Sequence, residues 1–234
     1  DPLGEYIAHI DCWGKFLAPN KVLIAQVPAN HPRYSEYEIT ANLFSNAYAY
    51  DSSGEQMQVY RVYEPGSNSA VTPYTNSLII NDHVFVPVTG TQWDEAALNV
   101  YRTAMPGYTV TPIMQSNYTP WMNTDALHCR THELADKEML FVRHTPLYGQ
   151  QTFGADCEIT ATIKSLGGHA LVQDSLLIWY RQVGGAWQSQ VLQPQGAGTY
   201  HTYLTDLAPE TEVDYYLTAQ DVTGRKVCHP FTGA

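Results

Sequence analysis

The stretch SLIINDHVFVPV, residues 77–88, decides the fold of the first part of this 234-residue chain. Two short apolar runs flank Asn81-Asp82, and small polar residues between two β-rich runs are typical of a hairpin turn. We therefore expect antiparallel strands at 77–80 and 83–88.

A helix is predicted directly after this hairpin. Thr91 can cap its first turn, with Asp94 three residues on in the capping-box position. The apolar stripe that follows consists of Trp93, Ala97, Val100 and Ala104. Pro106-Gly107 ends the helix, and residues 109–113 are predicted to form a strand. The order is strand, strand, helix, strand.

An earlier stretch repeats much of this order. Strands are predicted at 6–10, 21–27 and 58–63. A helix is predicted at 36–50, where Gly54 is its stop and the apolar stripe is Ile39, Leu43, Ala47 and Tyr50. Repeated ββαβ units would build a closed ring of small sheets around a central site. A strand at 138–143 is expected to complete this part.

The pattern of apolar and polar residues changes at about residue 146. Helical periodicity disappears, and short β-rich runs alternate with turn residues, which is typical of a β-sandwich. We predict an α+β protein with a first domain at 1–146, a sandwich domain at 147–234 and a linker at 146–154. Trp179 is a candidate core tryptophan of the sandwich, and Tyr215 or Tyr216 a candidate corner tyrosine.

Composition excludes several classes of protein. The net charge of −11 argues against a nucleic-acid surface, which needs a clustered basic patch. It suits a cationic substrate, although solubility alone also explains it. Four cysteines are too few for a disulfide scaffold, and Cys157 and Cys228 could pair. No apolar run has the length of a membrane span, and the first residues do not resemble a signal peptide.

Two motifs far apart in the chain supply the groups for covalent catalysis. His9 and Asp11 belong to the first, and residues 123–133, which contain Cys129, form the second. A thiolate that attacks and an imidazole that moves protons are the minimum for nucleophilic catalysis. Residues two apart on a strand share a face, so His9 and Asp11 can both face one pocket. Because the first motif lies so near residue 1, we expect residues upstream to be missing.

These motifs resemble those of the agmatine deiminase superfamily. Residues 9–11 resemble its His-Ile-Asp motif, and residues 123–133 resemble its nucleophile loop, with Cys129 as the nucleophile. The likeness is greatest to the secreted Porphyromonas-type peptidylarginine deiminases. Cys-Trp-Gly-Lys follows the first motif at 12–15, the nucleophile loop is not glycine-rich, and a sandwich module follows the catalytic part.

The resemblance implies a fold and a reaction. The fold is an α/β propeller of five ββαβ modules, of which this chain would hold the C-terminal portion, followed by an immunoglobulin-like domain. The reaction converts arginine in proteins or peptides to citrulline and releases ammonia through a covalent thiouronium on the cysteine. We expect no cofactor or metal. The expected partners are arginine-containing peptides or proteins and the missing N-terminal portion, without which the chain would be inactive. A secreted or outer-membrane-associated protein is implied.

The resemblance also carries over individual residues. It implies catalytic roles for Cys129, His9, Asp11 and Asn76, and it places Asp11, Tyr6, Ile7 and Thr124 against the substrate.

Other interpretations of these residues stay open. His128, Cys129 and His132 have spacing that could serve zinc, although no fourth ligand is apparent. Cys12 is expected to be a structural thiol, and Asp125 could cap the nucleophile loop. The alternative functions are an agmatine or small-guanidine deiminase and a non-catalytic fragment that needs an N-terminal partner. A papain-type protease is disfavoured, because its cysteine precedes its histidine.

Overall fold

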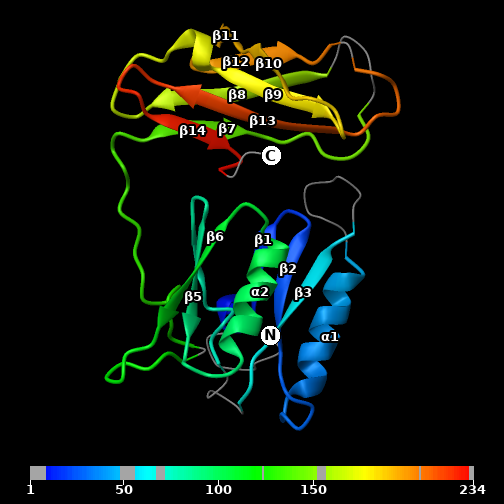
Figure 1. Cartoon of the computed structure of the whole chain (residues 1–234), viewed down its shortest axis with the longest axis vertical. Coiled ribbons are helices and arrows are strands. Elements are labelled where there is room, and N and C mark those ends of the chain that lie inside the picture. Colours follow the sequence, from blue (N-terminus) through cyan, green and yellow to red (C-terminus); the bar gives the residue numbers. More distant parts are fainter. Residues whose placement is uncertain are drawn as a thin grey trace. The chain divides into compact units, whose positions relative to one another are not determined.

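The chain divides into two compact units, residues 1–133 and residues 134–234 (Figure 1). The computed structural model describes residues 9–47, 56–66, 72–122, 124–151, 157–205 and 207–231. Both units are built mostly from β-strands, and the first also contains two α-helices, so the fold is mixed α+β. No helix of these described parts is long and apolar enough to cross a membrane.

The first unit begins with one small three-stranded module. After the short 3₁₀ helix η1 (Ile10–Cys12) come β1 (Gly14–Ala18), β2 (Lys21–Gln26), helix α1 (Tyr34–Ser45) and β3 (Gln58–Tyr63). Strands β1 and β2 pair antiparallel, whereas β2 and β3 pair parallel across the connection that holds α1. Val22 and Ile24 of β2 are fully buried, in the same hydrophobic cluster as Tyr37 and Ala41 of α1.

The second module repeats this topology. Its elements are β4 (Leu78–Ile80), β5 (His83–Val88), helix α2 (Asp94–Ala104) and β6 (Thr109–Met114). Strands β4 and β5 form the predicted hairpin, in which Asn81 has a φ of 53°, and β5 pairs parallel with β6. In the sheets of both modules, neighbouring strands follow one another in the same order as along the chain, β1-β2-β3 and β4-β5-β6. The predicted ββαβ repeat is therefore confirmed for two modules.

The expected strand at 6–10 is wrong where the structure describes it. His9 precedes η1, and Ile10 lies within that 3₁₀ helix, which the backbone bond from Trp13 N to Ile10 O closes at 2.9 Å. The first strand of the module starts only at Gly14. Cys12 and Trp13 turn into the hydrophobic core at this point, so Cys12 is a buried structural thiol as expected.

The predicted stripe of α1 does not face the core. Ile39 and Leu43 are 59% and 67% exposed, whereas Tyr37 and Ala41 are buried. Both sets of residues have helical spacing, and the larger area of the tyrosine favours burying its side of the helix. The stripe of α2 was predicted better, because its buried residues include Ala97 and Ala104 together with Leu98 and Tyr101.

The second unit contains two four-stranded antiparallel sheets around one core. One sheet has the order β11 (Gln193–Gly196), β12 (Thr199–Tyr203), β8 (Glu158–Ser165) and β7 (Leu140–His144). The other has the order β10 (Gln188–Val191), β9 (Leu177–Gln182), β13 (Val213–Gln220) and β14 (Lys226–His229), and a 3₁₀ helix, η3 (Gln173–Ser175), precedes β9. Ile159 and Ile163 of one sheet and Ile178 and Leu217 of the other belong to the same buried cluster.

Three details of the second unit differ from expectation. The strand predicted at 138–143 is β7, which pairs with β8 and so belongs to this unit and not to the first. The division between units accordingly falls after Glu133 instead of after residue 146. Trp179 is only half-buried and stacks on Tyr216, while its neighbour Tyr180 is buried. Tyr215 is the tyrosine that reaches a backbone amide, that of Leu147, at 2.7 Å.

Candidate active site

Asp11 enters the site from the turn that precedes β1. The residue is only 7% exposed, because η1 lies against the core that contains Cys12 and Trp13. Gly14 follows at a point of close approach, where a Cβ atom would meet the carbonyl oxygen of Leu23 at 3.1 Å. The tight pairing of β1 with β2 therefore holds Asp11 in place.

Asn76 enters from the corresponding loop, just before β4. Helix α2 secures this loop, since the hydroxyl of Tyr101 donates to the carbonyl oxygen of Tyr74 and is also hydrogen-bonded to the hydroxyl of Ser77, both at 2.8 Å. The hydroxyl of Tyr74 in turn donates to Asp94 at 2.7 Å. Asn76 is fully buried.

A buried carboxyl group supports the same loop. Glu64 directly follows β3 and is fully buried, and its Oε1 accepts a hydrogen bond from the backbone N–H of Thr75 at 2.8 Å. Burial raises the pKa of Glu64 well above its ordinary value, against the opposing effect of the bonds from Thr75 and Tyr74. Burial therefore favours the protonated form of this carboxyl group.

Cys129 lies in a tight turn closed by the bond from Arg130 N to Ala126 O at 3.0 Å. The guanidinium of Arg130 also clamps Asp125 through two bonds of 2.9 and 2.8 Å. These two bonds hold Asp125 within the turn, where the sequence suggested that it could cap the nucleophile loop. The turn is tied to the Asn76 loop, because the backbone N–H of His128 donates to Asn76 O at 3.2 Å.

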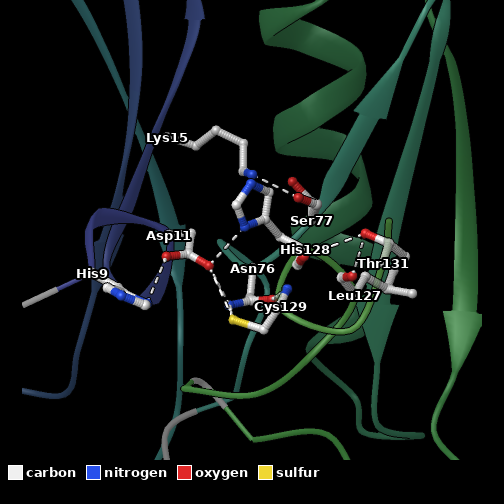
Figure 2. Close-up of polar contacts among 9 residues, drawn as sticks. All are labelled: His9, Asp11, Lys15, Asn76, Ser77, Leu127, His128, Cys129 and Thr131. Atoms are coloured by element: carbon white, nitrogen blue, oxygen red, sulfur yellow. Dashed lines mark hydrogen bonds and ion pairs between the residues drawn. The ribbon is translucent and has the colours of Figure 1, made fainter. Parts of the chain in front are cut away.

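The side chains of Asp11, Asn76 and Cys129 meet in one hydrogen-bonded cluster (Figure 2). Asn76 Nδ2 donates to Asp11 Oδ2 at 2.9 Å and to Cys129 Sγ at 3.1 Å. The Cys129 thiol donates to the same Asp11 oxygen at 3.2 Å. Asn76 Oδ1 accepts from the backbone N–H of Cys129 at 3.3 Å. Residues from the two predicted motifs are therefore in direct contact.

Two imidazoles flank Asp11. His9 is the predicted one, and its Nδ1 lies 4.0 Å from Asp11 Oδ1. His128 is closer, because its Nδ1 makes a hydrogen bond of 2.9 Å with Asp11 Oδ2. Both side chains are 54% exposed. Sequence reasoning considered His128 only as a metal ligand, although its position next to Cys129 was the signal that places it in the site.

The sequence of the chain matches the profile of the Porphyromonas-type peptidyl-arginine deiminases over residues 5–134. The chain belongs to this family. The match covers all residues of the cluster, and the family consists of deiminases, which hydrolyse C–N bonds of guanidino groups.

Several solved structures resemble this family member in part. An inferred arginine deiminase from Porphyromonas gingivalis is 23% identical with a TM-score of 0.42, covering 52% of this chain and 36% of that chain. The agmatine deiminase of Enterococcus faecalis is 22% identical with a TM-score of 0.39, and the match covers 45% of this chain and 35% of that chain. The agmatine deiminase of C. jejuni is 16% identical with a TM-score of 0.40, and the match covers 52% of this chain and 37% of that chain. This deiminase-family chain thus spans little more than a third of those proteins.

Burial and the neighbouring carboxylate together favour the protonated thiol of Cys129 in this family member. Burial alone would raise the pKa of Asp11, but the hydrogen bond from Cys129, the charge and bond of His128 and the charge of Lys15 bring that pKa below its ordinary value. For Cys129, burial and the neighbouring carboxylate raise the pKa, while the bond from Asn76 opposes them. Asp11 is therefore a carboxylate that accepts the proton of a neutral thiol.

The donor atoms of Asp11, His128 and Cys129 lie within 4.8 Å of one another, a spacing that could hold a metal ion. The amide of Asn76, however, directs N–H hydrogens at both the oxygen and the sulfur. A cation between those two atoms would face these positively polarised hydrogens, so the arrangement suits a hydrogen-bond network better than a metal site. His132, included in the zinc interpretation, is exposed and not one of these three donors.

The remaining predicted substrate-binding residues are Thr124, Tyr6 and Ile7. Thr124 is half-buried in the turn that leads to Cys129. Tyr6, Ile7 and Asn123 lie outside the described residues. Lys15 and Glu64, which sequence reasoning gave no role, both bond to the loop that carries Asn76.

Proposed function

We propose that this chain carries the nucleophile of a deiminase that converts peptide-bound arginine to citrulline. The observation that supports the proposal is the contact of the Cys129 thiol with both Asp11 and Asn76. A carboxylate, an amide and a thiol in one cluster suit a guanidinium substrate. The carboxylate can bind the positive charge of the guanidinium, and the sulfur can attack its central carbon.

In the first step Asp11 binds the substrate guanidinium. Its Oδ2 already accepts bonds from Asn76, His128 and Cys129, so Oδ1, which faces His9, is the oxygen with more room for the substrate. The cationic substrate compensates the carboxylate and thereby lowers the pKa of the thiol. Cys129 then releases its proton to the solvent, and the sulfur becomes a nucleophilic thiolate.

In the second step the thiolate forms a bond to the guanidinium carbon. One C–N bond of that carbon breaks, and His9 gives a proton to the nitrogen that leaves as ammonia. His9 then removes a proton from water, whose oxygen attacks the same carbon. The C–S bond breaks, the thiolate is regenerated, and the product is the urea group of citrulline. General acid–base catalysis of this kind contributes about 10²–10⁴ in rate.

The two imidazoles have different roles in this proposal. His128 is hydrogen-bonded to Asp11 and to the Asn76 backbone, so its position is fixed by the cluster. His9 lies on the other side of the carboxylate, with its Nδ1 4.0 Å from Asp11 Oδ1. We assign proton transfer to His9 and orientation of Asp11 to His128.

We also propose that the first unit is the C-terminal portion of a five-module propeller and that the second is an immunoglobulin-like domain. Two modules of identical strand order support the first assignment, and two antiparallel sheets around a common core support the second. Residues that complete the substrate site would come from an N-terminal portion, which is then a required partner of this chain.

The test uses the complete protein encoded by the full reading frame, with peptides carrying internal or C-terminal arginine, free arginine and agmatine as substrates. Citrulline should form from a peptide, and Cys129→Ala should reduce its rate by about a thousandfold or more. Cys228→Ala, in the second unit, is the matched control and should retain the rate. Citrulline formation by Cys129→Ala would refute the nucleophile, and turnover of agmatine alone would refute the peptide substrate.

A further inference from the structure

Glu64 belongs to the first module and bonds to a loop of the second. It directly follows β3, and its backbone N–H donates to the carbonyl oxygen of Gln26, the last residue of β2, at 2.8 Å. Its side-chain Oε1 accepts a hydrogen bond of 2.8 Å from the backbone N–H of Thr75, in the loop that precedes β4. Both residues are fully buried. The sheet of one module thereby fixes a loop of the other.

The acceptor that Glu64 offers explains why a carboxyl group is buried at this position. Burying a carboxyl group costs free energy, whereas an apolar side chain would pack there without that cost. An apolar side chain, however, would leave the buried N–H of Thr75 without the oxygen that it now contacts. A buried backbone N–H that loses its partner is itself costly, so the loop would move until the N–H reaches another acceptor.

Movement of this loop would displace Asn76, which directly follows Thr75. Asn76 Nδ2 donates to Cys129 Sγ at 3.1 Å, and Asn76 Oδ1 accepts from the backbone N–H of Cys129 at 3.3 Å. Hydrogen bonds weaken steeply with poor distance and angle, so a shift of about 1 Å would break these contacts. The bond between Glu64 and Thr75 therefore bears on the amide that faces the sulfur.

The contact of Asn76 with the sulfur affects ionisation of the thiol. Burial raises the pKa of Cys129 and the Asp11 carboxylate adds to the increase, whereas the bond from Asn76 opposes it. A thiolate accepts a stronger hydrogen bond than a neutral thiol does, because hydrogen bonds to ionised groups are the strong ones. Correct placement of the Asn76 amide thus favours the reactive form of the sulfur.

We propose that Glu64 is a positioning residue for the nucleophile: through the backbone of Thr75, its carboxyl oxygen holds the Asn76 amide against the sulfur of Cys129. The inference rests on the proposed role of Cys129 as nucleophile and deepens it. Glu64 acts by accepting a hydrogen bond and not by its charge. An uncharged side chain with an oxygen at the same place should therefore replace it.

The test measures the reactivity of Cys129 in the 234-residue chain without substrate. Iodoacetamide is applied at about pH 8, and alkylation of the Cys129 peptide is followed by mass spectrometry. Glu64→Leu removes the acceptor and should slow alkylation about tenfold, as expected for a lost hydrogen bond to a charged group. Glu64→Gln keeps Oε1 and should retain the rate of the unchanged chain.

A double-mutant cycle shows whether Glu64 acts through Asn76. Asn76→Ala removes the amide itself and should slow alkylation by about the same factor as Glu64→Leu. If both changes remove one and the same contact, the double variant should be about tenfold slower than the unchanged chain. Two independent effects would instead multiply to about a hundredfold.

General destabilisation of the first unit gives a different result. Unfolding would free the sulfur from burial and from Asp11, which both raise its pKa, so alkylation would become faster and not slower. Met57→Ala is the matched control, because Met57 is buried in a different core cluster from that of Tyr74 in the Asn76 loop. It should not slow alkylation.

Several outcomes would overturn the inference. They are an unchanged or faster rate in folded Glu64→Leu, a rate of Glu64→Gln as low as that of Glu64→Leu, and multiplied effects in the double variant. If circular dichroism shows that Glu64→Leu does not fold, Glu64→Asp takes its place in the cycle, because its shorter side chain withdraws the oxygen from Thr75. An unchanged rate in folded Glu64→Asp then overturns the inference. Failure of the deiminase proposal is seen separately, in citrulline formation.

Discussion

Asp11 and Asn76 are hydrogen-bonded at 2.9 Å although 65 residues separate them in the chain. Each lies just before the first strand of its own ββαβ module, Asp11 before β1 and Asn76 before β4. The two modules thus bring the same point of their topology together. One contributes a hydrogen-bond acceptor and the other a donor, and the cysteine turn completes the cluster.

Replacing Asn76 by Asp should suppress the reactivity of Cys129. The change removes the donor that contacts the sulfur at 3.1 Å and places a second carboxyl group beside Asp11. Because either effect disfavours the thiolate, alkylation at pH 7 should slow about tenfold or more. Asn42→Asp, on the exposed side of α1, adds the same charge away from the cluster and should leave the rate unchanged. Equal rates for both variants would contradict the role of Asn76.

Replacing Glu64 by Gln should change how the stability of the first unit depends on pH. The pKa of buried Glu64 is raised in the folded chain. Its contribution to the free energy of unfolding is therefore complete below about pH 4.5 and is lost as the pH rises toward the pKa of the folded state. The free energy of unfolding of Glu64→Gln should therefore increase relative to that of the unchanged chain as the pH rises, by up to about 1.4 kcal/mol per pH unit. Urea unfolding at several pH values measures this difference, and a constant difference would refute it.

Replacing Tyr101 by Phe should loosen the loop that carries Asn76. The variant loses the hydroxyl that is hydrogen-bonded to Tyr74 O and Ser77 Oγ, and it leaves these buried groups without that partner. We expect the free energy of unfolding to fall by about 1–3 kcal/mol, and hydrogen exchange of residues 74–77 to become faster. Tyr118→Phe is the control, because Tyr118 is 95% exposed. Unchanged exchange in Tyr101→Phe would show that other contacts hold the loop.

Acidification should destabilise the second unit through His144. Burial lowers the pKa of this histidine, whose Nδ1 bonds to Thr160 O and whose Nε2 bonds to the Tyr215 hydroxyl. The unfolded chain takes up the proton near pH 6.5 while the folded unit resists it, so stability is kept above pH 6.5 and lost below it. Protection of β7 and β13 against hydrogen exchange, measured relative to the intrinsic exchange rate at each pH, should decrease between pH 6.5 and 5. His144→Gln should weaken this dependence, and an identical dependence would exclude His144 as its cause.

The module topology was predictable from sequence because it depends on local signals. The turn at Asn81-Asp82, the helix end at Pro106-Gly107 and the alternation of apolar residues are each readable within a few positions. The orientation of α1 was not, since two of its faces share the helical period and only tertiary packing chooses Tyr37 over Ile39. The assignment of β7 failed for a similar reason, because strand pairing with β8 involves residues distant in sequence.

The site was predictable only as far as its motifs extend. Residue type and resemblance pointed to Asp11, Asn76 and Cys129, and these side chains are in contact. The hydrogen bond of His128 to Asp11 depends on the shape of the cysteine turn, and the approach of Lys15 depends on a strand that starts later than expected. Such effects of burial and long-range contact leave no local pattern in a sequence.

The resting thiol of Cys129 has a consequence for the survival of the protein in an oxidising environment. Peroxides and disulfides react with the ionised sulfur and hardly with its protonated form. A proton that stays on the sulfur, donated to Asp11, shields an exposed cysteine from sulfenic acid formation until a cation arrives. Under the proposed function, the network that makes ionisation of Cys129 depend on the substrate also protects the sulfur from oxidation while no substrate is bound.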